Sequence, residues 1–305
     1  MTGTILIGTA SWTDKTLIES GLFYPDEVKT PAGRLHYYAT QFPVVEADSS
    51  YYAMPSVRNA LLWVERTPPD FTFDVKAFRL FTQHQTDPQA LPKDIRDALG
   101  AVQKKNVYYR DLPPELKDEL WTRFAMAVEP LRAAQKLGVV LFQFPPWFVP
   151  SRAAFDHILE CAEQLRGFQV AVEFRNRTWF EGDRAAQVMA FEREHRLAHV
   201  VVDEPQGFAS SVPALWEVTC PHVAIVRFHG RNTDTWDKKG LSSSGERFNY
   251  LYADAELTEL AQKVRQLARE AKSVHAVFNN NFGDYAQRNA AQFRQMIARS
   301  MTEPR

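Results

Sequence analysis

Ionisable side chains gather near the ends of strand-like segments in this sequence. Those whose types suit proton transfer or nucleophilic attack are Glu46, Lys76, Glu173 and His229. Carboxylates and imidazoles transfer protons, and a lysine holds an anion or, when desolvated, attacks a carbonyl carbon. Side chains suited to hold a polar substrate beside them are Gln143, Arg175, Asp203, Arg227, Tyr250, Tyr252, Asn279 and Asn280. We therefore expect acid/base chemistry on a small polar or anionic molecule, with hydrolase, lyase and isomerase reactions all open.

The spacing of these residues predicts the face on which each lies. Successive side chains of a strand point to opposite faces, and in the segment 169–175 Val172 and Phe174 oppose Glu173 and Arg175. In the other strand segments the same alternation predicts that one face is charged. The residues of these charged faces are Glu46, Asp48, Asp74, Lys76, Asp203, Arg227 and His229. Desolvating an unpaired charge costs several kcal/mol. Such a set therefore indicates either a functional site or a structural ion-pair network.

The segments that must position these residues alternate between strand and helix patterns. Eight runs are typical of strands: 5–7, 44–48, 71–76, 139–144, 169–175, 199–203, 223–229 and 274–279. Apolar residues at three- and four-residue spacing predict helices between them, the two weakest at 183–194 and 207–217. This order predicts a single-domain (β/α)8 TIM barrel over residues 1–305, with an open doubly wound sheet as the alternative.

Parallel barrel strands are covered by helices on the outside, so the apolar faces should point outward and the charged faces inward. The charges also lie late in their strands, where barrel enzymes carry their active sites. We therefore expect Glu46, Lys76, Glu173, Arg227 and His229 to converge in one pocket. Long loops after strands 3 and 7, at 78–120 and 230–254, should border that pocket.

Composition narrows the class of protein and its partners. The 305 residues are 45% hydrophobic and carry a formal net charge of -1, which gives no global field for nucleic acid or anionic membranes. The cysteines Cys161 and Cys220 form no CxxC pair, which favours a reducing compartment. No apolar run reaches membrane-spanning length and no signal peptide is evident, so we expect a cytoplasmic protein. The oligomeric state stays open.

The sequence predicts no cofactor. A Gly-rich phosphate loop and a dinucleotide fingerprint are both missing from the sequence. Glu46, Glu173, Asp203 and His229 could form an oxygen-rich metal site, but HxH and HExxH spacings do not occur and three cations compete for the carboxylates. A divalent metal is therefore not favoured. Of Asn279 and Asn280, one should face the site, and the sequence does not say which.

An ordered series of short motifs resembles the YecE-like family, a barrel family of unknown function. The matches include Gly8-Thr9-Ala10-Ser11-Trp12, Gln143-Phe144-Pro145-Pro146, Glu173-Phe174-Arg175, Arg227-Phe228-His229-Gly230 and Phe278-Asn279-Asn280. Asp48 stands where that family usually has Asn, and Asn176 where it often has His. The resemblance implies the (β/α)8 fold and a shared pocket, and it supplies no reaction.

Two rival functions stay open beside the enzyme. The loop 78–120 contains basic residues that could contact nucleic-acid phosphates: Lys93, Arg96, Lys104, Lys105 and Arg110. Acidic residues of the same loop dilute their charge: Asp94, Asp97, Asp111, Glu115 and Asp118. The second rival is a protein that binds a small ligand without turnover.

Overall fold

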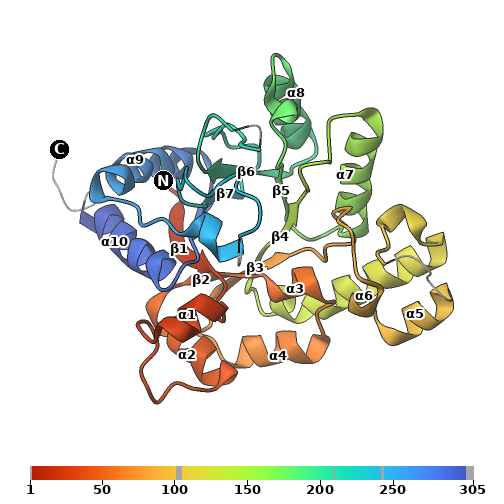
Figure 1. Cartoon of the computed structure of the whole chain (residues 1–305), viewed down its shortest axis with the longest axis horizontal. Coiled ribbons are helices and arrows are strands. Elements are labelled where there is room, and N and C mark those ends of the chain that lie inside the picture. The colour runs from red at the N-terminus through yellow and green to blue at the C-terminus, as the bar shows by residue number, and fades with distance from the viewer. Residues whose placement is uncertain (1, 101–104, 209, 242–243, 300–305) are drawn as a thin grey trace. The chain divides into compact units, whose positions relative to one another are not determined.

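Eight parallel strands form a closed barrel in chain order (Figure 1). The computed structural model of the protein describes residues 2–100, 105–208, 210–241 and 244–299. The strands are β1 (Thr4–Ala10), β2 (Val44–Ala47), β3 (Thr72–Lys76), β4 (Leu137–Gln143), β5 (Val170–Glu173), β6 (Ala198–Asp203), β7 (Val223–Phe228) and β8 (Ser273–Phe278). The predicted barrel is thus confirmed, and the open sheet was the wrong alternative.

Two compact parts make up the chain. Residues 1–46 and 177–305 form the first part, and residues 47–176 form the second. In the first part β6, β7, β8, β1 and β2 pair in sequence, and in the second β3, β4 and β5 do so. That the whole chain is one domain stays a prediction.

The first part carries helices whose apolar stripes cover its strands. They are α1 (Lys15–Ser20), α2 (Pro31–Gln41), α8 (Arg184–Glu194), α9 (Asp254–Glu270) and α10 (Tyr285–Arg299), with short 3-10 turns η3 (Arg177–Phe180) and η4 (Ser244–Phe248). Thr30 caps α2, since its hydroxyl accepts from the Gly33 amide at 3.0 Å, and Pro31 follows. Helices α9 and α10 lie side by side in Figure 1. Leu257 and Leu260 of α9 and Phe293 of α10 are buried.

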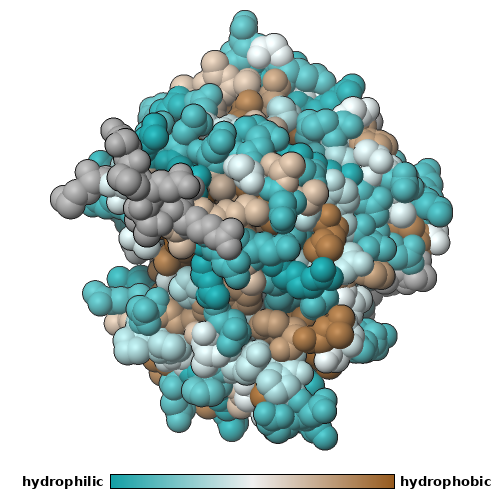
Figure 2. Space-filling model, turned by 90° about the vertical axis from the view of Figure 1, so that its left-hand side faces the viewer, coloured by the Kyte–Doolittle hydropathy of each residue, from teal (hydrophilic) through white to brown (hydrophobic). Residues whose placement is uncertain are grey.

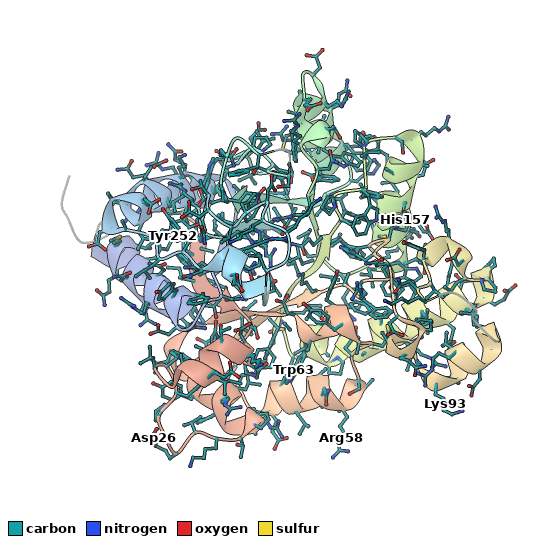
Figure 3. All side chains as sticks on the ribbon, viewed as in Figure 1. Asp26, Arg58, Trp63, Lys93, His157 and Tyr252 are labelled. Atoms are coloured by element: carbon teal, nitrogen blue, oxygen red, sulfur yellow. The ribbon has the colours of Figure 1, made fainter. Side chains whose placement is uncertain are left out.

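The second part contains α3 (Ser49–Tyr52), α4 (Val57–Glu65), η1 (Pro88–Ala90), α5 (Lys93–Leu99), η2 (Tyr109–Asp111), α6 (Pro114–Ala133) and α7 (Arg152–Gln164). The long segment after β3 therefore ends at Pro113, earlier than expected, and has helical turns of its own. His157 of α7, labelled in Figure 3, joins that helix to this segment. Its Nε2 lies 2.8 Å from the Phe81 carbonyl oxygen and its Nδ1 lies 3.1 Å from Oε2 of Glu160.

One expected helix is missing from the first part. Among the described residues of 207–217, which exclude residue 209, none is helical. Gly207 has a φ of +90°, and Pro213 has no amide hydrogen to donate to a helix. The apolar residues of this segment therefore pack as an irregular loop. The expected helix at 183–194 is present as α8, and Ser242 and Ser243 of the long loop after β7 lie outside the described residues.

A register shift between β3 and β4 explains why one of the charged residues, Asp74, is needed in the strand pair. The register shifts between Phe73 and Val75, and Oδ1 of Asp74 accepts a hydrogen bond from the Val139 amide at 3.1 Å. A buried backbone amide without a partner would cost free energy comparable to a lost hydrogen bond. Asp74 thus has a structural role in this strand pair.

The surface drawn in Figure 2 is mostly hydrophilic, with hydrophobic residues in small separate patches. Among the described residues, none of the helices is long and apolar enough to cross a membrane. Both cysteines are buried and free.

Candidate functional site

Glu46 and Arg227 form a buried ion pair in the first part. The guanidinium donates from Nε to Oε2 at 2.8 Å and from Nη2 to Oε1 at 2.6 Å. Because β8 and β1 separate β7 from β2 in the sheet, the two side chains can meet only across its inner face. Each side chain is 1% exposed. The pair thus lies on the face that the alternation assigned to it, and its charges neutralise each other away from solvent.

His229 lies beside this ion pair and is oriented by asparagine side chains. Its Nδ1 lies 2.7 Å from Nδ2 of Asn279, and its Nε2 lies 3.4 Å from Nη1 of Arg227. Asn281 donates to the Ala10 carbonyl at 2.9 Å and to Oδ1 of Asn279 at 3.1 Å. This arrangement turns the Asn279 amide nitrogen toward Nδ1 of the imidazole, while the Arg227 guanidinium faces Nε2.

The two adjacent asparagines point to different environments. Asn280 is fully buried, and its amide donates to the Tyr250 carbonyl at 2.8 Å and to Asn289 of α10 at 2.9 Å. Asn279 contacts His229 instead. Asn279 is therefore the asparagine of the inner face, and Asn280 attaches the outer helix to the preceding loop.

The strand register corrects the face expected for Asp203. Asp203 pairs with Phe228, whereas Val202 pairs with Arg227. Paired residues of parallel strands point to the same side, so Asp203 lies opposite to Arg227. Phe228 packs against Phe293 of α10, which identifies this side as the outer one.

The partners of Asp203 come from the loop after β7. Arg231 donates to its carboxylate from Nη2 at 2.7 Å, and the Tyr252 hydroxyl donates at 2.6 Å. Tyr252, labelled in Figure 3, is buried and also accepts from the Gly230 amide at 2.9 Å. Burial, reinforced by the Asp203 carboxylate, raises the pKa of Tyr252 well above its usual value. Tyr252 is thus a packing residue. Arg231 lies outside any strand, so alternation did not indicate it as the partner of Asp203.

Tyr250 packs closely over the glycine that follows His229. A side chain on Gly230 would meet Cβ of Tyr250 at 2.7 Å, and the φ of Gly230 is +84°, which favours glycine. The Tyr250 hydroxyl donates to Oε1 of Glu256 at 2.8 Å. Burial, followed by the hydrogen bond to Glu256, raises the pKa of Tyr250 to about 12. Tyr250 therefore holds the loop against α9.

Glu173 lies at the end of β5 in the second part. Its Oε1 accepts from Nε2 of Gln143 at 2.7 Å and from Nη1 of Arg175 at 3.3 Å. Gln143 and Glu173 are paired in register, and Lys76 pairs with Leu141, two residues before Gln143. Since Phe142 packs outward against Trp121 of α6, Lys76, Gln143 and Glu173 share the inner face. The Glu173 carboxylate is fully buried, whereas 17% of the Arg175 side chain is exposed.

Lys76 has both an acidic and an aromatic neighbour. Its Nζ lies 3.4 Å from Oδ1 of Asp48 and 4.9 Å from the centre of the Tyr51 ring. The Arg79 guanidinium lies 5.2 Å from the same ring. Burial raises the pKa of the Tyr51 hydroxyl, which keeps that group protonated. Two cations therefore flank one neutral ring at the end of β3, and Asp48 offsets the charge of Lys76.

His84 lies outside the strand patterns, although with Thr82 it is one of the residues that resemble the YecE-like family. Its ring contacts Tyr51 at 5.2 Å and Trp147 at 5.7 Å, and its Nδ1 lies 2.8 Å from the Thr82 hydroxyl. Burial, followed by the charges of Arg79 and Lys76, lowers the pKa of His84 to about 3. His84 lies outside any strand, so alternation could not have found it. It is the neutral hydrogen-bonding group of this cluster.

Each part thus brings together some of the expected residues: Glu46, Arg227, His229 and Asn279 in the first, and Lys76, Gln143, Glu173 and Arg175 in the second. That all of them share one pocket stays a prediction. Among the described residues, His, Cys, Asp and Glu side chains form no group of three or more that could hold a metal ion. Lys104 of the long segment after β3 lies outside the described residues.

Comparison with known families gives a match over almost the whole chain. The family described as "Protein of unknown function DUF72" matches residues 6–305. The UPF0759 protein YunF of Bacillus subtilis (strain 168) is 32% identical over 295 residues, which cover 96% of this chain and 94% of that protein.

Solved structures give the same result. A DUF72 family protein from Enterococcus faecalis superposes with a TM-score of 0.80 at 27% identity and covers 97% of this chain and 96% of that chain. One from Thermotoga maritima gives a TM-score of 0.73 at 29% identity, with 97% and 99% covered. The resemblance expected under the name YecE-like is therefore found under the names DUF72 and UPF0759.

Proposed function

This chain belongs to the DUF72 family, and on that premise we propose that it is an enzyme acting on a small anionic substrate. Lys76 and Arg175 hold the anion, and Glu173 transfers protons. Proton transfer by one carboxylate serves hydrolysis, elimination and isomerisation alike. In this proposal Gln143 orients Glu173, and His84 is a neutral hydrogen-bonding group.

The observation that carries the proposal is the difference in exposure between the cations of the inner face. The Arg227 side chain is 1% exposed and is held bidentately by Glu46. The Lys76 side chain is 11% exposed and that of Arg175 is 17% exposed, and each contacts a carboxylate at more than 3 Å. A ligand can therefore reach Lys76 and Arg175 more readily than it can displace Glu46 from Arg227.

In this proposal the residues of the first part have supporting roles. Glu46, expected from the sequence to transfer protons, instead holds Arg227 in place. His229 is the remaining proton-transfer candidate of that part, because Asn279 orients its ring. The free, buried cysteines support the proposed cytoplasmic location.

The rival nucleic-acid function has less support. Lys93 of α5 forms an ion pair with Asp97 at 2.6 Å, and Arg123 of α6 pairs with Asp94. A phosphate-binding surface needs positive charge. In this segment acidic neighbours offset that charge.

The test compares turnover by the wild-type protein and by two glutamate variants on a panel of phosphorylated and carboxylated metabolites. Glu173→Gln should lower kcat by about a hundredfold or more, the usual range for losing a general acid or base. The matched control is Glu163→Gln, which changes an exposed glutamate of α7 and should leave kcat unchanged. Turnover that survives in Glu173→Gln contradicts the proposal. Binding without turnover by the wild-type protein favours the non-catalytic alternative.

A further inference from the structure

A cavity of about 410 Å³ lies in the second part, away from Glu173 and Lys76. Its lining residues come from the segment after β3 and from the turn after β4: Gln83, Gln85, Tyr108, Tyr109, Arg110 and Trp147. Volumes of roughly 300–1,000 Å³ are typical of small-molecule sites. The cavity is therefore large enough for a ligand of metabolite size.

The backbone around this cavity is held in a fixed conformation. Thr86 and Val107 form an antiparallel bridge with two hydrogen bonds of 2.9 Å. Gln83 has a φ of +61°, which is uncommon for a residue with a side chain. Its amide donates to the Leu80 carbonyl at 3.1 Å. Such conformations persist where the surrounding structure enforces them, and they concentrate at ligand sites.

The lining offers one exposed aromatic face with polar groups around it. Trp147 is 55% exposed, and its indole Nε1 donates to the Gln83 carbonyl at 3.4 Å. The Arg110 guanidinium lies 5.3 Å from the Tyr108 ring. The amides of Gln83 and Gln85 each combine donors and an acceptor. None of the lining residues that the structure describes is acidic, so the cavity favours a flat, polar and anionic ligand.

We propose that this cavity binds the base of a nucleotide. An indole face stacks on any nucleobase, and a glutamine amide can pair with the donor and acceptor on a base edge. The Arg110 guanidinium is suited to bind the phosphate.

A series of aromatic side-chain contacts runs from the cavity to the candidate active site within the same part. Trp147 contacts His84, His84 contacts Tyr51, and Tyr51 lies against Lys76. Taking the nucleotide as the substrate class rests on the proposed function, whereas its binding does not.

Isothermal titration with AMP, GMP, CMP and UMP tests the inference, with ribose 5-phosphate as the probe that lacks a base. The wild-type protein should bind at least one nucleotide and bind ribose 5-phosphate far more weakly. Trp147→Ala should weaken nucleotide binding by about tenfold or more, because stacking is lost. Gln83→Gly removes the amide but tolerates the positive φ, so it should weaken binding without unfolding the segment. The control Met126→Ala alters an equally exposed residue of α6 and should change nothing.

The outcomes separate this inference from the proposed function. It is overturned if none of the four nucleotides binds, if ribose 5-phosphate binds as tightly, or if Trp147→Ala binds them normally. Glu173→Gln should retain nucleotide binding, because Glu173 does not line the cavity. Nucleotides that bind through Trp147 but are never turned over would support the cavity and contradict only their role as substrates.

Discussion

Two glutamates of the inner strand face have different surroundings. Glu46 accepts two hydrogen bonds from Arg227, and both side chains are buried. Glu173 accepts from a neutral amide at 2.7 Å and from a partly exposed arginine at 3.3 Å. A buried charge stabilises the fold only when its partner is present, whereas a charge near a solvated partner tolerates neutralisation better. The two residues should therefore respond differently to substitution.

Arg227→Met should destabilise the protein by about 3–5 kcal/mol, the range for stranding one member of a buried pair. Alternation alone could not show that Glu46 closes over Arg227. Urea unfolding measures the effect. The double variant Glu46→Gln with Arg227→Met serves as control and should recover part of the loss. An unchanged free energy of unfolding in Arg227→Met would show that solvent reaches Glu46.

Glu173→Gln should change the free energy of unfolding by less than about 1 kcal/mol, or raise it slightly. The amide keeps the shape of the carboxylate, and the exposed edge of Arg175 can be solvated. Thermal unfolding beside the Arg227→Met variant provides the comparison. A loss as large as that of Arg227→Met would mean that Glu173 belongs to a closed structural network and not to a functional site.

His84 should make the protein sensitive to acid. Its folded-state pKa of about 3 lies below its ordinary value of 6.5 because burial, Arg79 and Lys76 oppose the charged ring. The unfolded chain binds the proton first, so this contribution is fully present above pH 6.5 and is lost as the pH falls toward 3. The stability difference between the wild-type protein and His84→Gln should therefore shrink over this interval, by a few kcal/mol. A difference independent of pH would refute the neutral assignment.

At the level of elements, α7 depends on a charged histidine. The Phe81 carbonyl and the Glu160 carboxylate face the two ring nitrogens of His157, which favours a proton on each. Burial lowers the pKa of His157, but Cys161, Glu160 and the Phe81 carbonyl together outweigh it and raise the pKa to about 10.

The charge of His157 should therefore stabilise the second part in neutral and acidic solution. Because the folded pKa is raised, the contribution is fully present below pH 6.5 and is lost as the pH rises through about 10. Unfolding titrations of the wild-type protein and His157→Gln should show a difference of a few kcal/mol at pH 6 that declines toward pH 10. The opposite trend would mean that His157 is neutral in the folded protein.

The sequence predicted strands and helices well where one pattern dominated. All eight strand segments are present, because buried parallel strands are rich in β-branched and aromatic residues. The helix expected at 207–217 is not found in its described residues, since Pro213 outweighs apolar spacing. Asp203 was assigned to the wrong face because β6 has valines at 200, 201 and 202, on both of its faces. Alternation cannot orient a strand that is apolar on both sides.

At the level of the whole molecule, the candidate residues divide between the two compact parts. Alternation indicated the inner side for Glu46, Lys76, Glu173 and Arg227, because it depends only on neighbouring residues. Contacts made by loop residues were not predictable in this way. Arg231, His84 and Trp147 acquire their roles from the fold of segments that have no regular period. The convergence of both groups on one ligand depends on the whole barrel and stays a prediction.

The central claim is that the strand ends around Lys76 and Glu173 form a substrate site, and a crystal soaked with a mixture of phosphorylated and carboxylated metabolites tests it most directly. We predict electron density for one compound with its anionic group within hydrogen-bonding distance of Lys76 Nζ or the Arg175 guanidinium, and with a reacting carbon or oxygen close to Glu173. Density that appears only elsewhere on the protein, with Lys76 still contacting Asp48 and Arg175 still contacting Glu173, would contradict the account.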